Sequence, residues 1–340
     1  MVQKTVKIAG SLTVAKVAHG LMRFTWTSTP VSDDIAFDAI KSGIDALPQG
    51  VKMFLNGGAF YSQDGGPANV ELIARFFEKY PEYADRAFLS IKGGNRAGGS
   101  GIDCSAENLR RSVDQILTAL RGTKRLDLFE PARIDPAVSV EDMMQTLAQL
   151  REEGKFDYTG LSECRAETLR RAHAVHPIAV AEIEVSPFTY EDETKKVIGT
   201  AKELGIAIAA YSPLGFGLLT GTIQSAKELP EGDMRRNFSR FQEDTMKANK
   251  TVSDALKIIA ERKNIPLGQL CIAWVGYLGD HIIPLPGSSH KTRTLENLQG
   301  GNVDLSSSEL QEINQVLASN KIHGERYFGG DANKSVRLWG

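Results

Sequence analysis

Short apolar runs alternate regularly with amphipathic stretches along most of this chain, and this alternation constrains the fold more than any other feature. Strands that alternate with helices form a parallel sheet, because each helix carries the chain back to the edge where the last strand began. We expect eight strands, near residues 15–20, 51–55, 87–92, 126–130, 158–162, 178–182, 207–211 and 282–286. We expect amphipathic helices over residues 34–46, 106–120, 139–153, 166–174 and 192–204.

Eight strand–helix units within 340 residues favour a closed (β/α)₈ barrel, the TIM barrel of the α/β class. An open, doubly wound sheet stays as the alternative. Barrels of this length commonly form one domain, so we expect a single domain over residues 1–340. Two segments break the rhythm: a long polar loop after the seventh strand, residues 214–250, and a C-terminal tail, residues 319–340. Such long loops are usually functional or disordered.

The composition argues against several classes of binding partner. The formal net charge is −2, which argues against nucleic acid or an anionic membrane as the main partner. There is no run of about 18 apolar residues that could span a bilayer. The first residues lack the apolar core of a secretory signal. The three cysteines are widely spaced and fit reduced thiols, and the histidines show no metal-ligand spacing. We therefore expect a cytoplasmic protein without a metal that acts on a small molecule; the sequence does not indicate its oligomeric state.

Polar side chains stand where the predicted strands end. In a barrel these ends gather at one mouth, where catalytic groups lie. Tyr61 follows one strand and Lys92 ends the next. A nearby lysine lowers the pKa of a phenol, which then can protonate a developing alkoxide near neutral pH. Taken alone, such a pair is more often a turn tyrosine and a surface lysine. The residues at or just past strand ends are Asn56, Lys92, Ala132, Ser162, Glu182 and Tyr211.

Two segments have the character of phosphate sites. Residues 215–221 are rich in glycine, but their spacing differs by one from the dinucleotide fingerprint, so we interpret them as a loop that wraps an anion with backbone amides. Residues 284–297 end a strand and open a helix that carries Ser288, Lys291 and Arg293. A helix start of this kind suits a phosphate, although a capped surface helix is the simpler interpretation of this segment alone. Residues 93–99 lack the ending of a P-loop and are expected to form a surface loop.

In combination these motifs resemble the aldo-keto reductase superfamily over nearly the whole chain, with the closest similarity to the fungal pyridoxal reductases. The segment Asn56–Tyr61 is similar to the family's Asp-Thr-Ala-x-x-Tyr. Lys92 stands at the position of the family's catalytic lysine. Residues 160–163, 211–214 and 288–297 are similar to its cofactor segments, and residues 126–135 carry the similarity to the pyridoxal reductases.

The resemblance implies a barrel that binds NADPH or NADP⁺ and reduces an aldehyde to a primary alcohol, with pyridoxal, giving pyridoxine, as the best substrate. It implies that Tyr61, Lys92 and Asn56 are catalytic. The pocket residues that it implies are Trp26, Phe60, Ala132 and Arg133. The cofactor residues that it implies are Gly20, Leu21, Met22, Ser162, Glu163, Glu182, Tyr211, Ser212, Leu214, Gly217, Ser288, Arg293, Glu296 and Asn297, with Tyr211 stacked on the nicotinamide and Arg293 on the 2′-phosphate.

The chain departs from the family pattern at four positions. Asn56 replaces an aspartate and Ala132 replaces a histidine. Glu163 and Glu182 stand where an asparagine and a glutamine are common. Losing the aspartate leaves more of the lysine's positive field on the phenol, unless Glu130 or Glu182 takes over as its counterion. Losing the histidine removes a hydrogen-bond donor and widens the pocket.

Two alternatives to a pyridoxal reductase stay open. One is a general aldehyde or carbonyl reductase. The other, from a different class, is a cofactor-sensing binding protein similar to the channel-associated subunits that share this ancestry, because two members of the catalytic tetrad are missing. The intact pair of Tyr61 and Lys92 favours an enzyme, because a pure binding protein need not keep it.

Overall fold

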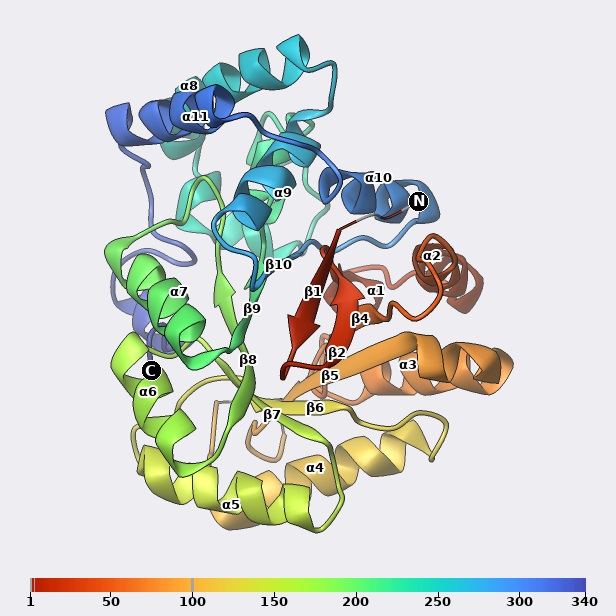
Figure 1. Cartoon of the computed structure of the whole chain (residues 1–340). Coiled ribbons are helices and arrows are strands. Elements are labelled where there is room, and N and C mark those ends of the chain that lie inside the picture. Colours follow the sequence, from red (N-terminus) through yellow and green to blue (C-terminus); the bar gives the residue numbers. More distant parts are fainter. Residues whose placement is uncertain (1, 3, 99–100) are drawn as a thin grey trace.

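The computed structural model describes residues 2, 4–98 and 101–340, and its centre is a ring of parallel strands (Figure 1). Neighbouring strands follow one another in sequence order from β3 to β10. The ring closes where Gly20 lies beside Gly287 in a parallel bridge and its N–H donates to Pro286 O at 3.0 Å. The strands are β3 (His19–Gly20), β4 (Met53–Gly58), β5 (Ala87–Gly93), β6 (Leu128–Pro131), β7 (Tyr158–Ser162), β8 (Ile178–Glu184), β9 (Ala207–Tyr211) and β10 (Ile282–Leu285). The predicted α/β barrel is confirmed, and the open sheet is ruled out.

Helices surround the ring (Figure 1). The longer ones that follow strands are α2 (Asp33–Asp45), α3 (Ala68–Lys79), α4 (Ala106–Leu120), α5 (Val140–Glu152), α6 (Ala166–Val175), α7 (Asp192–Leu204), α9 (Leu267–Tyr277) and α10 (Lys291–Gly300). Helix α5 begins as its sequence predicts, because Ser139 Oγ accepts a hydrogen bond from Asp142 N at 3.0 Å. Helix α3 is absent from the sequence-based expectations, although its buried positions recur at helical spacing.

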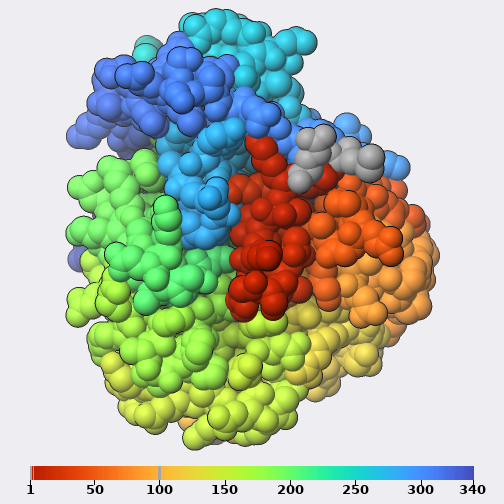
Figure 2. Space-filling model, viewed as in Figure 1, coloured from red at the N-terminus to blue at the C-terminus, as the bar shows by residue number. Residues whose placement is uncertain are grey.

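The N-terminal segment differs from its prediction. Residues 15–20 do not form one strand: β1 (Thr5–Ile8) and β2 (Leu12–Ala15) pair as an antiparallel hairpin, and only His19–Gly20 joins the barrel. The hairpin side chains Val6, Ile8 and Val14 pack into the same buried cluster as Phe54 and Phe88. Figure 2 shows the red N-terminal residues surrounded on this face by later parts of the chain. The hairpin therefore covers the end of the barrel where the strands begin.

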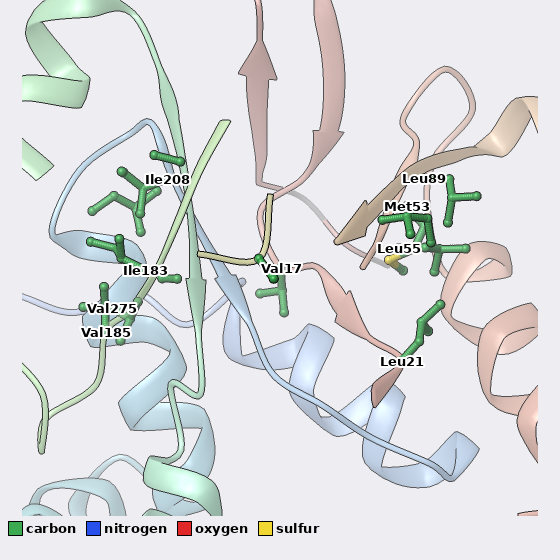
Figure 3. Close-up of a cluster of buried hydrophobic side chains, with 14 of the residues drawn as sticks. Val17, Leu21, Met53, Leu55, Leu89, Ile183, Val185, Ile208 and Val275 are labelled. Atoms are coloured by element: carbon green, nitrogen blue, oxygen red, sulfur yellow. The ribbon is translucent and has the colours of Figure 1, made fainter. Parts of the chain in front are cut away.

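Between strands and helices lies a second layer of apolar side chains. Figure 3 shows Leu55 and Leu89 together on one side of the barrel and Ile183, Val185 and Ile208 near Val275 of α9 on the other. These residues alternate with those that face the barrel interior, as the two-residue period of a strand requires. Both faces of each strand are thus buried, which makes the barrel a fixed frame for side chains at its strand ends.

The polar loop after the seventh strand is more ordered than expected. It consists of 3₁₀ turns η2 (Gly215–Thr220), η3 (Ala226–Glu228), η4 (Met234–Asn237) and η5 (Ser239–Phe241), followed by helix α8 (Glu243–Arg262). Helix α8 packs against α11 (Ser307–Ser319), after which the tail continues through η6 (Gly330–Val336).

The expected surface loop at 93–99 is described only through residue 98, and Met1 and Gln3 of the N-terminal segment also lie outside the description. In the described part of the chain, no helix combines the length and the apolar character needed to cross a membrane.

Candidate active site

A polar layer of inward-facing residues rests on the apolar layer inside the barrel. Along β4 and β5, Phe54 and Phe88 lie in the apolar cluster, and two residues further on the same face carries Asn56 and Ser90. Strands β6 and β8 repeat the change, from Leu128 to Glu130 and from Val180 to Glu182. The strand period therefore brings side chains that are far apart in sequence into one buried layer at the C-terminal mouth.

Lys92 is the centre of this layer. Its Nζ lies 2.6 Å from Glu182 Oε1 and 3.9 Å from Glu130 Oε1, and it donates a hydrogen bond to Asn56 Oδ1 at 2.7 Å. Asn56 Nδ2 in turn donates to Glu182 Oε2 at 2.7 Å. Lys92 and Glu182 are only 5% and 2% exposed. The counterion of the lysine is therefore Glu182, and Asn56 holds both partners.

The protonation states follow from burial and neighbouring charge. Burial raises the pKa of Glu130 well above its ordinary value, and the neighbouring Glu182 adds to this effect. Ser90 Oγ donates to Glu130 Oε1 at 3.2 Å. Burial alone would lower the pKa of Lys92, but Glu182, Tyr61 and Glu130 together raise it. Lys92 thus stays a cation. Glu130, the second acid beside it, favours its own protonated, neutral form.

Tyr61 reaches this layer from the loop after β4. A Cβ on Gly58 would meet the Tyr61 ring at 2.8 Å, so only a glycine leaves room for the ring to fold back. Thr25 Oγ1 donates to Tyr61 O at 2.5 Å and fixes the backbone. The ammonium of Lys92 lies 5.5 Å from the centroid of the Tyr61 ring. The predicted pair of phenol and lysine is therefore brought together.

One expectation about this pair is wrong. Lys92 does not bring the pKa of Tyr61 below its ordinary value in this structure. Burial raises that pKa, Lys92 lowers it, and the charges of Glu182 and Glu130 raise it again, with a net increase. The main reason is the burial of the phenol, and the nearby carboxylate of Glu182 offsets part of the lysine's effect. Tyr61 consequently stays protonated and can serve as a proton donor.

The predicted pocket residues lie close to Tyr61. The ring of Trp26 is 5.5 Å from the Tyr61 ring and 5.9 Å from the Phe60 ring, measured between centroids. Ala132 is 5% exposed at the end of β6, where its N–H donates to Gly93 O at 2.9 Å. Arg133 follows it and is half-buried. An aromatic wall thus stands beside the phenol, and the β6 end carries only a methyl group where an imidazole is common.

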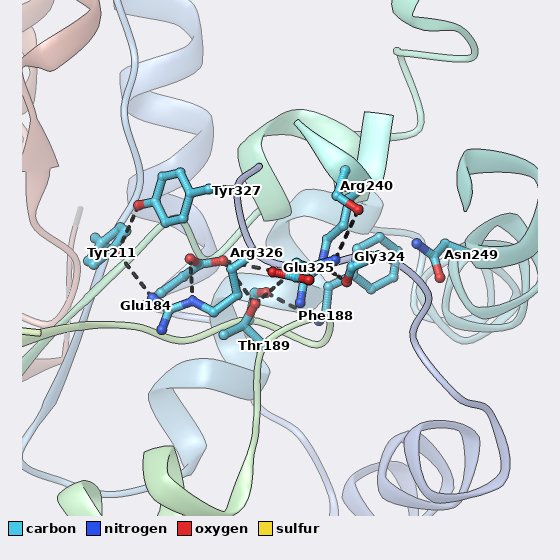
Figure 4. Close-up of polar contacts among 12 residues, drawn as sticks. Glu184, Phe188, Thr189, Tyr211, Arg240, Asn249, Gly324, Glu325, Arg326 and Tyr327 are labelled. Carbon is cyan, nitrogen blue, oxygen red and sulfur yellow. Dashed lines mark hydrogen bonds and ion pairs between the residues drawn. The ribbon is translucent and has the colours of Figure 1, made fainter. Parts of the chain in front are cut away.

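The C-terminal tail adds a cluster that the sequence did not reveal (Figure 4). Arg326 pairs with Glu163 through Nη2 at 2.6 Å and Nη1 at 3.1 Å, and with Glu184 Oε2 through Nε at 2.9 Å. Arg326 Nη2 also donates to Tyr211 OH at 3.1 Å, and Tyr211 OH lies 2.9 Å from Tyr327 OH. Burial would raise the pKa of Glu163, but Arg326 holds it below its ordinary value. The tail is therefore anchored on the ends of β7, β8 and β9.

At the nicotinamide end of the expected cofactor site, only some of the predicted residues are free to bind a cofactor. Ser162 Oγ is buried without a hydrogen-bond partner among the described residues, as a group awaiting a ligand would be. Glu163 and Ser212 hold φ values of 53° and 51°, a left-handed conformation that non-glycine residues keep mainly at functional positions. Against this, the carboxylates of Glu163 and Glu182 are already paired with Arg326 and Lys92. Ser162 thus keeps free hydrogen-bonding capacity at this end, as far as the described residues show.

The phosphate end fits better. The side chain of Arg293 is exposed and makes no ion pair or hydrogen bond with any residue that the structure describes. Asn297 Nδ2 is buried without a partner in that same part of the chain. Ser288 Oγ is bound to His19 Nε2 at 3.1 Å and to Thr294 Oγ1 at 2.7 Å, so His19 and Thr294 brace this end although sequence reasoning missed them. A free guanidinium and a free amide on α10 suit a phosphorylated nucleoside.

The remaining predicted cofactor residues lie at the end of β3 and on the segments that follow β3, β9 and β10. Gly20 ends β3, Leu21 N donates to Asn56 O at 2.9 Å, and Met22 begins the short helix α1 (Met22–Thr25). Leu214 precedes η2, within which Gly217 has φ 103°. Glu296 is exposed on α10. Their assignment to a cofactor stays a prediction.

Comparison with known proteins places this geometry in a family. Residues 16–318 match the Aldo/keto reductase family. The chain is 35% identical over 327 residues to a probable pyridoxal reductase of Schizosaccharomyces pombe, covering 94% of this chain and 96% of that protein. It is 34% identical over 276 residues to an NADP(+) aldo-keto reductase of the same yeast, covering 79% and 81%. A glycerol dehydrogenase from Gluconobacter oxydans shares the fold, with TM-score 0.80 at 21% identity over 97% of this chain and 100% of that one.

Proposed function

The chain belongs to the Aldo/keto reductase family, and from this premise we propose that it reduces an aldehyde to a primary alcohol with NADPH, with pyridoxal as the best substrate and pyridoxine as the product. Membership makes it an oxidoreductase that uses a nicotinamide cofactor on small carbonyl compounds. The proposal adds the direction, the preference for NADPH and the substrate. We further propose that residues 1–340 form one cofactor-binding domain and that the protein is cytoplasmic.

The observation that carries the proposal is the buried set of Tyr61, Lys92, Asn56 and Glu182 at the mouth of the barrel. NADPH, when bound, would supply the hydride for the carbonyl carbon. Tyr61 gives its proton to the oxygen on which negative charge develops. The ammonium of Lys92 stabilises the phenolate that remains, and Asn56 and Glu182 hold that ammonium in place.

The residues free to bind the cofactor support NADPH over NADH. Arg293 offers positive charge for a 2′-phosphate, and Lys291 at the start of the same helix adds to it, although Lys291 Nζ lies 3.7 Å from Asp38 Oδ1. Ser162 and Asn297, at the two ends, contribute polar atoms that have no hydrogen-bond partner among the described residues. The relative whose name includes NADP(+) points the same way.

The choice of pyridoxal rests on pocket shape and on a relative. Ala132 leaves room at the end of β6, and Trp26 and Phe60 offer aromatic faces to a planar ring. The relative from Schizosaccharomyces pombe is named a probable pyridoxal reductase. A general aldehyde reductase is the alternative within the same chemistry. A cofactor-sensing binding protein is disfavoured, because it has no need of the phenol and lysine pair.

The test is the loss of NADPH absorbance on adding pyridoxal, 4-nitrobenzaldehyde or no aldehyde, with the product identified by chromatography. We expect consumption of NADPH with pyridoxal and formation of an equal amount of pyridoxine. Consumption of NADPH with 4-nitrobenzaldehyde but not with pyridoxal would identify the protein as a general aldehyde reductase. Tight NADPH binding without turnover of either aldehyde would assign the binding protein.

A further inference from the structure

Arg133 is an arginine without a carboxylate partner at the mouth of the barrel. Its Nε donates to Val336 O at 2.8 Å and its Nη1 to Ala132 O at 2.6 Å. Within the described part of the chain, no carboxylate lies within 4.0 Å of the guanidinium, and Nη2 makes no hydrogen bond. Arg326, by comparison, pairs with both Glu163 and Glu184. Arg133 therefore keeps one donor face free.

Arg133 follows Ala132 just past the end of β6, which places it at the mouth of the barrel that holds the candidate site. Burial opposes its charge, but Tyr211, Tyr327, Glu163 and Tyr61 together raise its pKa above the ordinary value. Tyr61 is the proposed proton donor and Tyr211 ends β9 at the same mouth. Both tyrosines thus lie near enough to the cation to influence its charge. Among the described residues, the hydrogen bonds of this half-buried cation go to backbone carbonyls, which leaves capacity for an anion.

The backbone fixes where the guanidinium points. One of its two hydrogen bonds goes to the preceding residue at the end of β6, and the other goes to Val336, which lies in the tail 203 residues away. The tail therefore orients Arg133 through a carbonyl, which restrains the group without neutralising it. Such a restrained, unpaired guanidinium is suited to recognise an oxygen anion at a defined place.

We propose that Arg133 binds an ionised oxygen that the substrate carries beside its carbonyl group, so that this site selects aldehydes with an adjacent acidic hydroxyl. This inference rests on the proposed function and deepens it. Pyridoxal carries such a hydroxyl on the ring carbon next to the aldehyde-bearing carbon. The small side chain of Ala132 leaves the ring room to bring that oxygen to Arg133, and the charge recognition compensates for the missing imidazole.

The experiment compares pyridoxal with its 3-O-methyl ether, which has the same ring and aldehyde but no ionisable hydroxyl. The variants are Arg133→Met and Arg133→Lys. The matched control is Arg86→Met, because Arg86 also donates to backbone carbonyls, at 2.8 Å and 3.2 Å, but precedes β5 at the other end of the barrel. Both kcat/KM for each aldehyde and the equilibrium affinity for each aldehyde and for NADPH are measured.

We expect Arg133→Met to lower kcat/KM for pyridoxal by about 10- to 100-fold, the loss typical of one charged hydrogen bond, and to change the value for the methyl ether by less than about twofold. Arg133→Lys should recover part of the preference, and Arg86→Met should keep all of it. An equal loss for both aldehydes, or a loss confined to NADPH affinity, would overturn the proposal by assigning Arg133 to structure or to the cofactor.

The binding measurement separates this inference from the proposed function. If the protein turns over neither aldehyde, the proposed function fails, yet tighter binding of pyridoxal than of its methyl ether that disappears in Arg133→Met still supports the anion site. If the unmodified protein reduces and binds both aldehydes equally, the anion site is refuted while the reductase stands. Should Arg133→Met fail to fold, the same comparison in Arg133→Lys decides, since it keeps a cation with altered geometry.

Discussion

Lys92 Nζ and Glu182 Oε1 lie 2.6 Å apart in the barrel interior, although their strands β5 and β8 are separated by two others. In the family that the chain belongs to, an aspartate is usual at the position of Asn56 and a glutamine is common at that of Glu182. In this chain the amide, Asn56, is on β4 and the carboxylate, Glu182, is on β8, which is the reverse of the usual arrangement. Because Asn56 bonds to both Lys92 and Glu182, the layer keeps its ion pair but moves the negative charge across the barrel.

This reversed arrangement predicts how the pH dependence responds to Glu182→Gln. Glu182 contributes to the raised pKa values of both Tyr61 and Lys92, so its removal should lower both. Reduction needs a protonated Tyr61; the alkaline limb of kcat/KM should therefore move to lower pH. The pH profile measures this shift, with Glu193→Gln on an outer helix as the control. An alkaline limb that stays in place would show that Glu182 does not tune the phenol.

Arg293 tests the choice of cofactor. We expect the unmodified protein to bind NADPH at least about tenfold more tightly than NADH, and Arg293→Ala to reduce that difference by about 1.5–3 kcal/mol, the range of a charged hydrogen bond. Equilibrium titration of both cofactors measures the difference. The control is Arg121→Ala, because Arg121 is exposed and pairs with Glu78 away from α10. Equal affinities in the unmodified protein would refute the assignment of Arg293.

Ala132 tests the shape of the pocket. Ala132→His should lower kcat/KM for pyridoxal, because the imidazole crowds the ring at the end of β6. The same change should spare or improve a small aldehyde without an adjacent hydroxyl, since a well-placed oxyanion donor contributes about 3 kcal/mol. Comparing kcat/KM for the two aldehydes in both proteins gives the ratio. A constant ratio, or one that moves toward pyridoxal, contradicts a pocket opened for that ring.

The tail contacts predict how stability depends on pH. Arg326 holds the pKa of Glu163 below its ordinary value, so the stability gained from this pair is complete above the ordinary carboxyl pKa of about 4.3 and is lost as the pH falls through the lower folded value. Glu163→Gln should lower the free energy of unfolding by roughly 1–3 kcal/mol at neutral pH. Urea unfolding should show this difference shrinking in acid, with the exposed neighbour Glu325→Gln as the control. A difference that does not change with pH contradicts the assignment.

The alternation of strands and helices predicted most of the barrel because each unit is a local pattern. Two predicted strands, Tyr158–Ser162 and Ala207–Tyr211, have the bounds found in the structure. The bounds of the first strand were wrong because polar and apolar residues alternate over residues 5–20 and the turn of the hairpin, with Ala9 and Gly10 at positive φ, was not recognised. A hairpin and a barrel strand share the same two-residue period, so the period alone could not divide them.

The site was predictable where it depends on strand ends and was missed where it depends on distant segments. The positions of Tyr61 and Lys92 follow from the strand boundaries. The roles of Glu130 and Ser90 could have been found by counting two residues along each strand from the apolar interior layer. Arg326 could not, because its partner Glu163 lies 163 residues earlier and the tail has no periodic pattern. The net increase in the pKa of Tyr61 was also out of reach, since it depends on how deeply the phenol is buried and on the charges of Glu182 and Glu130.

The most direct test of the account is the turnover of pyridoxal by Tyr61→Phe, with NADPH affinity measured on the same protein. The control is Tyr158→Phe, because Tyr158 begins β7 at the opposite end of the barrel. We predict that Tyr61→Phe binds NADPH as the unmodified protein does and reduces pyridoxal about 10²–10⁴ times more slowly, the usual contribution of a general acid. Near-normal turnover in Tyr61→Phe, with cofactor affinity unchanged, would contradict the assignment of Tyr61 as the proton donor.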